Sequence, residues 1–329
     1  MEKISVTILS GFLGSGKTSL LNHIIRSNTG RKIAIIENEF GEINIDSELV
    51  ISAKDDIYEL TNGCVCCSLN TELLQTVLEL RDKGFDHVIL ETTGIADPGQ
   101  VAATFLFDED IQNYIQLNAI ITLVDAKQVT KQLETMPEVH KQIGYADVLV
   151  LNKLDLVDEN QKQAVKRLLG DLNTEARVYE ARHGAANIPN LFSLNMLTAR
   201  HVLQANFADT TLAEPAHQGL VSYSFIIKEP LIEGKLSPWL MAMLFLSGAE
   251  LYRVKGILSF ENENRRYVFQ AVGQQYMHTY GEEWAGETER VSKIVFIGRK
   301  LNRQHLAAGL YGCVASAEKK VAAGTFLRR

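Results

Sequence analysis

Long apolar runs are absent from this sequence. No stretch of the 329 residues approaches the roughly 20 apolar residues that a membrane-spanning helix needs. A secretory leader is not expected either, because the chain enters an alternating strand pattern almost at once, at Ile4. We therefore expect a soluble, cytoplasmic protein with no membrane partner.

Basic residues are fewer than acidic residues. The chain has 33 Lys and Arg against 40 Asp and Glu, a net charge of −7 and a pI of about 5.7. Binding to phosphate backbones needs clustered basic residues, so nucleic acid is not expected as the principal partner. The 46% apolar and 22% charged residues are typical of a globular protein, and the length suffices for two cores.

Cysteine is scarce and unevenly placed. Of four cysteines, three lie within Cys64–Cys67 and the fourth is Cys313. Thiols this close together cannot build an ordinary disulfide network, which excludes a disulfide scaffold. Metal ligation is the favoured role, since thiolates select Zn²⁺ and similar divalent ions such as Co²⁺ or Ni²⁺. Redox activity and simple apolar burial are the alternatives.

A glycine-rich segment follows the first strand pattern. Gly11 to Thr18 fits G-x-x-x-x-G-K-[ST] and leads into a helical pattern at Ser19–Ile25. Such a loop directs successive N–H groups and a helix N-terminus at phosphates. Lys17 is expected to neutralise the β- and γ-phosphate oxygens, and Thr18 to bind Mg²⁺. The predicted nucleotide contacts here are Gly11, Gly14, Ser15, Gly16, Lys17, Thr18 and Ser19.

A second motif concerns the base. The apolar run 146–151 ends in Asn152, Lys153, Leu154 and Asp155, an N-K-x-D pattern. The Asp155 carboxylate can accept from both N1–H and the 2-amino group of guanine, a pair that adenine does not offer. The pattern predicts binding of GTP and GDP rather than ATP. Asp155 as a simple helix cap is the alternative.

Between these motifs, an apolar run at His87–Leu90 predicts a buried parallel strand that ends in Glu91. Glu91 occupies the place of the Mg²⁺-holding carboxylate of P-loop proteins, and Gly94 that of the γ-phosphate sensor. Ile95 and Ala96 follow, so the water-orienting glutamine of Ras-like enzymes is missing and slow hydrolysis is expected. The predicted catalytic residues are Lys17, Thr18, Glu91 and Gly94.

An acidic turn follows a further predicted strand at Ile33–Ile36. Glu37 and Glu42 in this turn are the nearest candidates in the sequence to complete a metal site with the cysteines. A solvated acidic loop is the alternative for either glutamate.

Five segments together resemble the CobW-like P-loop GTPases, in particular the YjiA-type members. These segments are Gly11–Thr18, Glu37–Glu42, Gly63–Cys67, Glu91–Pro98 and Asn152–Asp155. The resemblance implies a GTP-hydrolysing metallochaperone or metal-insertion factor, with zinc the favoured metal, that serves a client metalloprotein. Cys64, Cys66 and Cys67 would form its metal motif, with Glu37 and Glu42 in support. The histidine-rich stretch of many relatives is lacking.

Two other functions stay open. One is a regulatory GTPase switch whose cysteines are structural or redox-sensing, with no metal delivery. The other, an ATP-dependent kinase, is weakened by Asp155. The sequence leaves open whether the chain forms a homo-oligomer.

The pattern of elements predicts an α/β fold: a P-loop GTPase domain with a mainly parallel sheet, plus a smaller C-terminal α+β domain. We predict the domains at 1–204 and 220–329, joined by a linker at 205–219. Met and aromatic residues at helical spacing in 239–245 are expected to be core.

Overall fold

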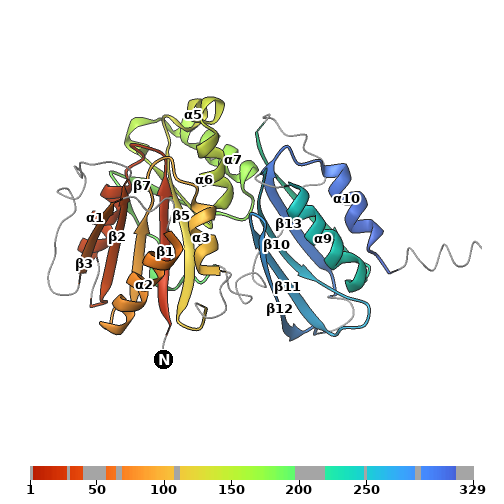
Figure 1. The fold of residues 1–329 in the computed structure, drawn as a ribbon. Helices are drawn as coiled ribbons and strands as arrows, with labels where there is room; N and C mark the ends of the chain where they lie inside the picture. Colours follow the sequence, from red (N-terminus) through yellow and green to blue (C-terminus); the bar gives the residue numbers. More distant parts are fainter. Residues whose placement is uncertain are drawn as a thin grey trace, which may run out of the picture. The chain divides into compact units, whose positions relative to one another are not determined.

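The structure is a computed structural model of the chain. It describes residues 3–27, 30–39, 57–63, 69–106, 112–196, 219–247, 250–285 and 290–315. The chain folds as two compact units, Met1–Leu197 and Thr198–Arg329 (Figure 1). Residues 205–218 of the expected linker lie outside the described ranges, so the domain boundaries stay a prediction.

The N-terminal unit is built on one sheet. Its strands run in the order β3-β2-β4-β1-β5-β6-β7-β8, and every neighbouring pair is parallel except β7 with β8. The central strands are buried apolar runs, as expected of a sheet covered on both faces. The bounds are β1 Ile4–Gly11, β2 Ile33–Glu39, β3 Ile57–Gly63, β4 His87–Glu91, β5 Ile115–Asp125, β6 Val148–Asn152, β7 Arg177–Arg182 and β8 Ala185–Ala186.

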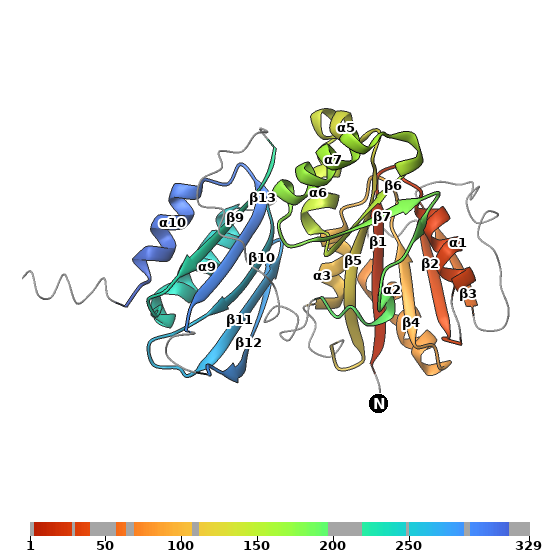
Figure 2. The same cartoon turned by 180° about the vertical axis from the view of Figure 1, so that it is seen from behind.

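Helices cover both faces of this sheet. Helix α1 packs on one face, and α2, α3 and α6 lie on the other (Figures 1 and 2). The bounds are α1 Lys17–Ser27, α2 Leu69–Asp82, α3 Pro98–Leu106, α5 Val129–Thr135, α6 Pro137–Tyr145 and α7 Glu159–Leu172, with short 3-10 turns η2 Leu154–Leu156 and η3 Leu191–Ser193. This arrangement confirms the predicted α/β P-loop architecture.

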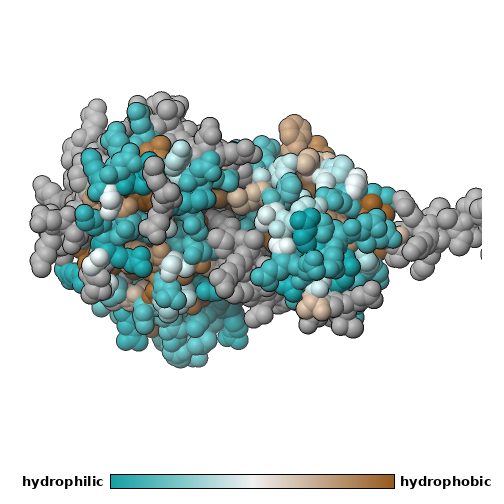
Figure 3. Space-filling model, turned by 90° about the horizontal axis from the view of Figure 1, so that it is seen from below, coloured by the Kyte–Doolittle hydropathy of each residue, from teal (hydrophilic) through white to brown (hydrophobic). Residues whose placement is uncertain are grey.

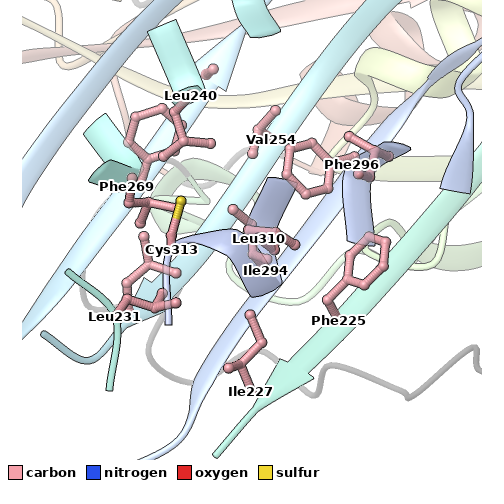
Figure 4. Packing of buried hydrophobic residues seen from close by; sticks show 14 of the residues in the cluster. Phe225, Ile227, Leu231, Leu240, Val254, Phe269, Ile294, Phe296, Leu310 and Cys313 are labelled. Carbon is pink, nitrogen blue, oxygen red and sulfur yellow. The ribbon is translucent and has the colours of Figure 1, made fainter. Parts of the chain in front are cut away.

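The C-terminal unit is a five-stranded antiparallel sheet in the order β12-β11-β10-β13-β9. Helices α9 and α10 cover one face, and their leucines meet Phe225, Phe269 and Phe296 from the strands (Figure 4). The bounds are β9 Leu220–Ile227, α9 Glu233–Ser247, β10 Leu251–Leu258, β11 Arg265–Val272, β12 Gln275–Glu283, β13 Ser292–Arg299 and α10 Arg303–Gly312. The predicted smaller α+β domain is therefore confirmed.

Helix α9 departs from one expectation. Leu240 and Leu244 are core residues and Trp239 and Met243 pack against them, but Phe245 is 77% exposed. The prediction that the Met and aromatic residues of 239–245 are core is wrong for Phe245 and for Met241, because the helix is apolar on its outer side as well. Such exposed apolar residues are exceptions on the surface that Figure 3 shows, which is mainly hydrophilic. Among the described helices, none is long and apolar enough to cross a membrane.

Candidate nucleotide-binding site

The segments predicted to bind nucleotide all follow the carboxyl ends of strands in the parallel sheet. The glycine-rich loop follows β1, Glu91 ends β4, and Asn152 ends β6. Because β1 pairs with both β4 and β5, and β5 with β6, these ends meet at one edge of the sheet. Ligands of open α/β sheets bind at this edge.

The glycine-rich loop has the conformation that an anion cradle needs. Gly16 has φ +104, and a Cβ there would collide with the Asn152 amide. Lys17 begins α1, is nearly buried, and its Nζ donates to the Gly11 carbonyl oxygen at 3.0 Å. The first turn of α1 contains no acidic residue, so the positive end of the helix dipole is uncompensated at the loop. Gly14, Ser15, Thr18 and Ser19 complete the loop and the first turn of α1.

Asn152 ties this loop to the guanine side. Its Nδ2 donates to the Ser15 carbonyl oxygen at 2.9 Å, and its Oδ1 accepts from the Gly184 N–H at 3.0 Å. Asn152 is only 1% exposed, so its amide makes these bonds away from water. One buried side chain therefore positions the phosphate loop and the turn after β7 together.

Lys153 and Asp155 belong to the same motif as Asn152. Lys153 has a left-handed backbone, with φ 60, and its Nζ forms an ion pair with Asp125 at 2.8 Å. Asp155 lies in η2 with its side chain 26% exposed, and the His183 ring approaches it to 3.9 Å. The Asp155 carboxylate is thus within reach of a ligand at the sheet edge.

The segment after β4 forms a tight turn beside the phosphate loop. The Thr92 N–H donates to the Leu9 carbonyl oxygen of β1 at 2.9 Å, and the Ala96 N–H donates back to Thr93 at 3.1 Å. A Cβ at Gly94 would lie 2.7 Å from the backbone nitrogen of Leu13, so only glycine allows this approach. The structure therefore brings Gly94 against the phosphate loop.

The predicted transition-metal ligands are described in part or not at all. Cys64, Cys66, Cys67 and Glu42 lie outside the described residues, and only the backbone of Glu37 is described. Glu37 stands opposite Glu91 on β4 and opposite Thr61 on β3. Within the described ranges, no three His, Cys, Asp or Glu side chains gather as a metal site.

Two residues of the site, Asp125 and Gln142, are not among those predicted from the sequence. Asp125 ends β5, a strand whose run of apolar residues followed by an acid resembles that of β4 and could have been recognised. Gln142, on α6, donates to the Gly94 carbonyl oxygen at 2.9 Å. No motif marks it, because a single glutamine in an amphipathic helix is unremarkable by sequence.

Comparison with known proteins agrees with this geometry. Residues 5–180 match the family model described as CobW/HypB/UreG, nucleotide-binding domain, and residues 220–314 match the cobalamin synthesis protein cobW C-terminal domain. The chain is 35% identical to the zinc chaperone YjiA of Escherichia coli, over 95% of this chain and 99% of that protein. It is 29% identical to the zinc-regulated GTPase metalloprotein activator 1 of Dictyostelium discoideum, over 72% of this chain and 59% of that protein.

Solved structures of the E. coli protein are also similar. The Zn(II)-bound YjiA GTPase superposes with a TM-score of 0.75 at 30% identity, covering 95% of this chain and 99% of that chain. A triple mutant of YjiA, with alanine in place of one glutamate and two cysteines, is likewise described as Zn(II)-bound and gives the same TM-score of 0.75 and 30% identity, covering 95% of this chain and 100% of that chain. By its matched domains, its fold and its similarity over nearly the full length, this chain belongs to the CobW family of P-loop GTPases.

Proposed function

We propose that this chain binds and hydrolyses GTP, and that its nucleotide state controls the binding and transfer of a zinc ion to a client metalloprotein. The phosphates would lie on the loop and the first turn of α1, against Lys17. The guanine would lie at Asn152, Lys153 and Asp155. The nucleotide-binding set is Gly11, Gly14, Ser15, Gly16, Lys17, Thr18, Ser19, Asn152, Lys153 and Asp155.

Thr18 and Glu91 would hold Mg²⁺, and their placement fits this role. Thr18 lies in the first turn of α1 and is partly exposed, while Glu91 ends β4 opposite Leu9 of β1. Both supply the oxygen ligands that Mg²⁺ prefers. The ion, when bound, neutralises charge on the β- and γ-phosphates.

Hydrolysis is expected to be slow. Gly94 would donate its N–H to the γ-phosphate, but Ile95 beside it is apolar and 61% exposed, and Ala96 carries no polar group. Neither side chain can orient the attacking water. A rate well below the enzyme median of about 10 per second follows, unless metal, a client or a second copy of the chain completes the site.

The single observation that carries the coupling is the register of β2, β3 and β4. Glu37 on β2 stands opposite Glu91 on β4, and β3 ends at Gly63, one residue before the first cysteine. This register supports the coupling, because β3 ends at the same, carboxyl end of the sheet as β1 and β4. Cys64, Cys66 and Cys67 would be the zinc ligands, with Glu37 and Glu42 in support, and the thiols suit the reducing cytoplasm.

The nucleotide assignment is tested at Asp155. Asp155→Asn should weaken GTP binding and favour xanthine nucleotides, whose 2-oxo group needs a donor. The measurement is a competition titration of GTP, xanthosine triphosphate and ATP against a fluorescent nucleotide. Equal affinity of the unaltered protein for ATP and GTP would overturn the assignment.

The metal assignment is tested by Zn²⁺ affinity in the GDP state and in a GTP-analogue state at fixed pH, because thiolate ligation releases protons. We expect a difference worth about 1–3 kcal/mol, matched by an equal effect of metal on nucleotide affinity. Identical affinities would instead support a regulatory GTPase whose cysteines are structural or redox-sensing.

Stoichiometry has to be measured in the same titration, because the related triple mutant is described as zinc-bound. The double variant Cys66→Ser with Cys67→Ser should lose one nucleotide-dependent ion and the thiolate-to-Co²⁺ charge-transfer absorption. GTP binding should survive. An unchanged Co²⁺ spectrum would remove these cysteines from the ligand set.

A further inference from the structure

The turn from Thr92 to Asp97 has two different attachments. On one side it lies against the phosphate loop, where Gly94 approaches the Leu13 backbone. On the other side it is bonded by helix α6. Under the proposed function, this turn binds the γ-phosphate. The groups that hold the turn in place therefore affect the affinity for GTP.

Gln142 makes the central contact from α6. Its Nε2 donates to the Gly94 carbonyl oxygen at 2.9 Å and lies 3.5 Å from the Ala96 carbonyl oxygen. The residue is 1% exposed. A buried amide that donates to a buried carbonyl is costly to lose, because the carbonyl then has neither its partner nor water.

The helix that carries Gln142 is itself fixed. The Thr122 hydroxyl of β5 donates to the Gln142 carbonyl oxygen at 2.8 Å. At the end of α6, Asn173 donates to the Ile143 and Ala146 carbonyl oxygens at 2.7 and 3.0 Å. Gln142 is thus a side chain on a rigid element, which is what accurate positioning of a neighbouring loop requires.

Lys141, the preceding residue, contacts the same turn in a different way. Its Nζ forms an ion pair with Asp97 at 2.8 Å, at the far end of the turn, and the Lys141 side chain is 31% exposed. A partly solvated ion pair contributes little. Two adjacent residues of one helix therefore provide a buried and a solvated attachment to one turn.

We infer that Gln142 is a positioning residue for γ-phosphate recognition: its amide holds the Gly94 turn against the phosphate loop before nucleotide arrives. This inference rests on the proposed GTPase function. A turn that is already ordered does not lose further conformational freedom when the γ-phosphate binds. GDP lacks that phosphate and gains nothing from the ordered turn, so Gln142 discriminates GTP from GDP without touching either.

The test measures affinity for a non-hydrolysable GTP analogue and for GDP in Gln142→Leu and Gln142→Met. We expect analogue affinity to fall about tenfold, the effect of one buried hydrogen bond, with GDP affinity changed less than twofold. Lys141→Met is the matched control and should change the ratio of the two affinities less than twofold. An unchanged ratio of the two affinities in both Gln142 variants would overturn the inference, whether each affinity stays the same or both fall equally.

Gln142→Glu keeps the inference testable if the apolar variants fail to fold. As a neutral acid, the new side chain donates one hydrogen bond, whereas as a carboxylate it repels the two carbonyl oxygens. Analogue affinity relative to GDP should therefore fall as pH rises in this variant alone, and a pH-independent ratio would count against positioning. If the unaltered protein binds no guanine nucleotide, the proposed function has failed; if it does and the variants match it, only this inference has.

Discussion

The two ends of the parallel sheet in the N-terminal unit use buried polar side chains for opposite purposes. At the carboxyl end, the buried amides of Asn152 and Gln142 donate to loops that would contact a nucleotide. Toward the amino end, buried polar groups bond to one another and to a single covering segment. The same strands thus carry the proposed nucleotide site at one end and a structural cluster at the other.

The cluster toward the amino end has Asn118 at its centre. Asn118 is fully buried, and its Nδ2 donates to Thr7 Oγ1 at 2.9 Å and to the Leu191 carbonyl oxygen at 2.8 Å. Its Oδ1 accepts from the Asn195 N–H at 2.9 Å. Asn118 therefore fastens the segment around η3 to the sheet.

His87 completes this cluster. Its Nε2 lies 2.8 Å from Thr7 Oγ1, and its ring meets Phe192 edge to face at 5.0 Å between centroids. Burial, aided by the charge of Arg31, lowers the pKa of His87 from 6.5 to about 3. His87 is thus neutral in the folded protein across the physiological range. Substitutions at the two ends should therefore separate nucleotide chemistry from stability.

The largest expected effect is at the carboxyl end. Lys17→Ala should lower GTP hydrolysis about 100- to 1,000-fold by removing charge compensation at the phosphates. Multiple-turnover phosphate release measures this. The melting temperature should move little, because the hydrogen bond that the Lys17 amine donates to the Gly11 carbonyl oxygen stays within the phosphate loop. If Lys17→Ala unfolded the protein, nucleotide chemistry and stability would not be separable between the two ends of the sheet.

The second largest effect is expected on stability, at Asn118 toward the amino end of the sheet. Asn118→Ala should lower the free energy of unfolding by about 3 kcal/mol, because it leaves buried donors and acceptors without partners. Denaturant titration measures the loss, and affinity for GDP should stay within twofold. Gln116→Ala is the control: its amide bonds the same segment through Asn195 at 2.8 Å but is only partly buried, so it should cost less.

The stability of the fold should also depend on pH through His87. Between pH 6.5 and about 3 the unfolded chain binds a proton at His87 that the folded chain does not, so stability should fall as pH falls through this window. The slope from this group is at most about 1.4 kcal/mol per pH unit. His87→Gln should flatten the curve of unfolding free energy against pH from 6 to 4. Parallel curves for the variant and the unaltered protein would show that His87 does not set this dependence.

The smallest effect is expected on nucleotide affinity, at Asp125 at the carboxyl end of the sheet. Asp125→Asn should weaken guanine nucleotide binding about threefold, since the Lys153 side chain is one-third exposed and its ion pair is partly screened. Raising the salt concentration should shrink the difference. A loss as large as that of Asp155→Asn would mean that Asp125 touches the nucleotide.

Much of this architecture was predictable from local pattern. The apolar runs 33–36 and 87–90 appear as β2 and β4, and the helical pattern at 19–25 lies within α1. Strands β3, β5, β7, β8 and β12 and helices α3, α5 and α6 were not predicted. Several of them carry polar residues on one face or at their ends, such as Arg177 and Glu180 in β7, so that the apolar period is weak.

The nucleotide-binding motifs can be recognised from the sequence, because the glycine-rich loop and the N-K-x-D motif are contiguous and their backbone conformation depends on a few neighbouring residues. Tertiary structure alone decided which side chains hold those motifs in place. Gln142 contacts Gly94 from 48 positions away, Asn118 contacts Thr7 from 111 and Asn152 contacts Ser15 from 137. Such bonds join residues whose separation is set by the order of strands in the sheet, so no local period in the sequence can reveal them.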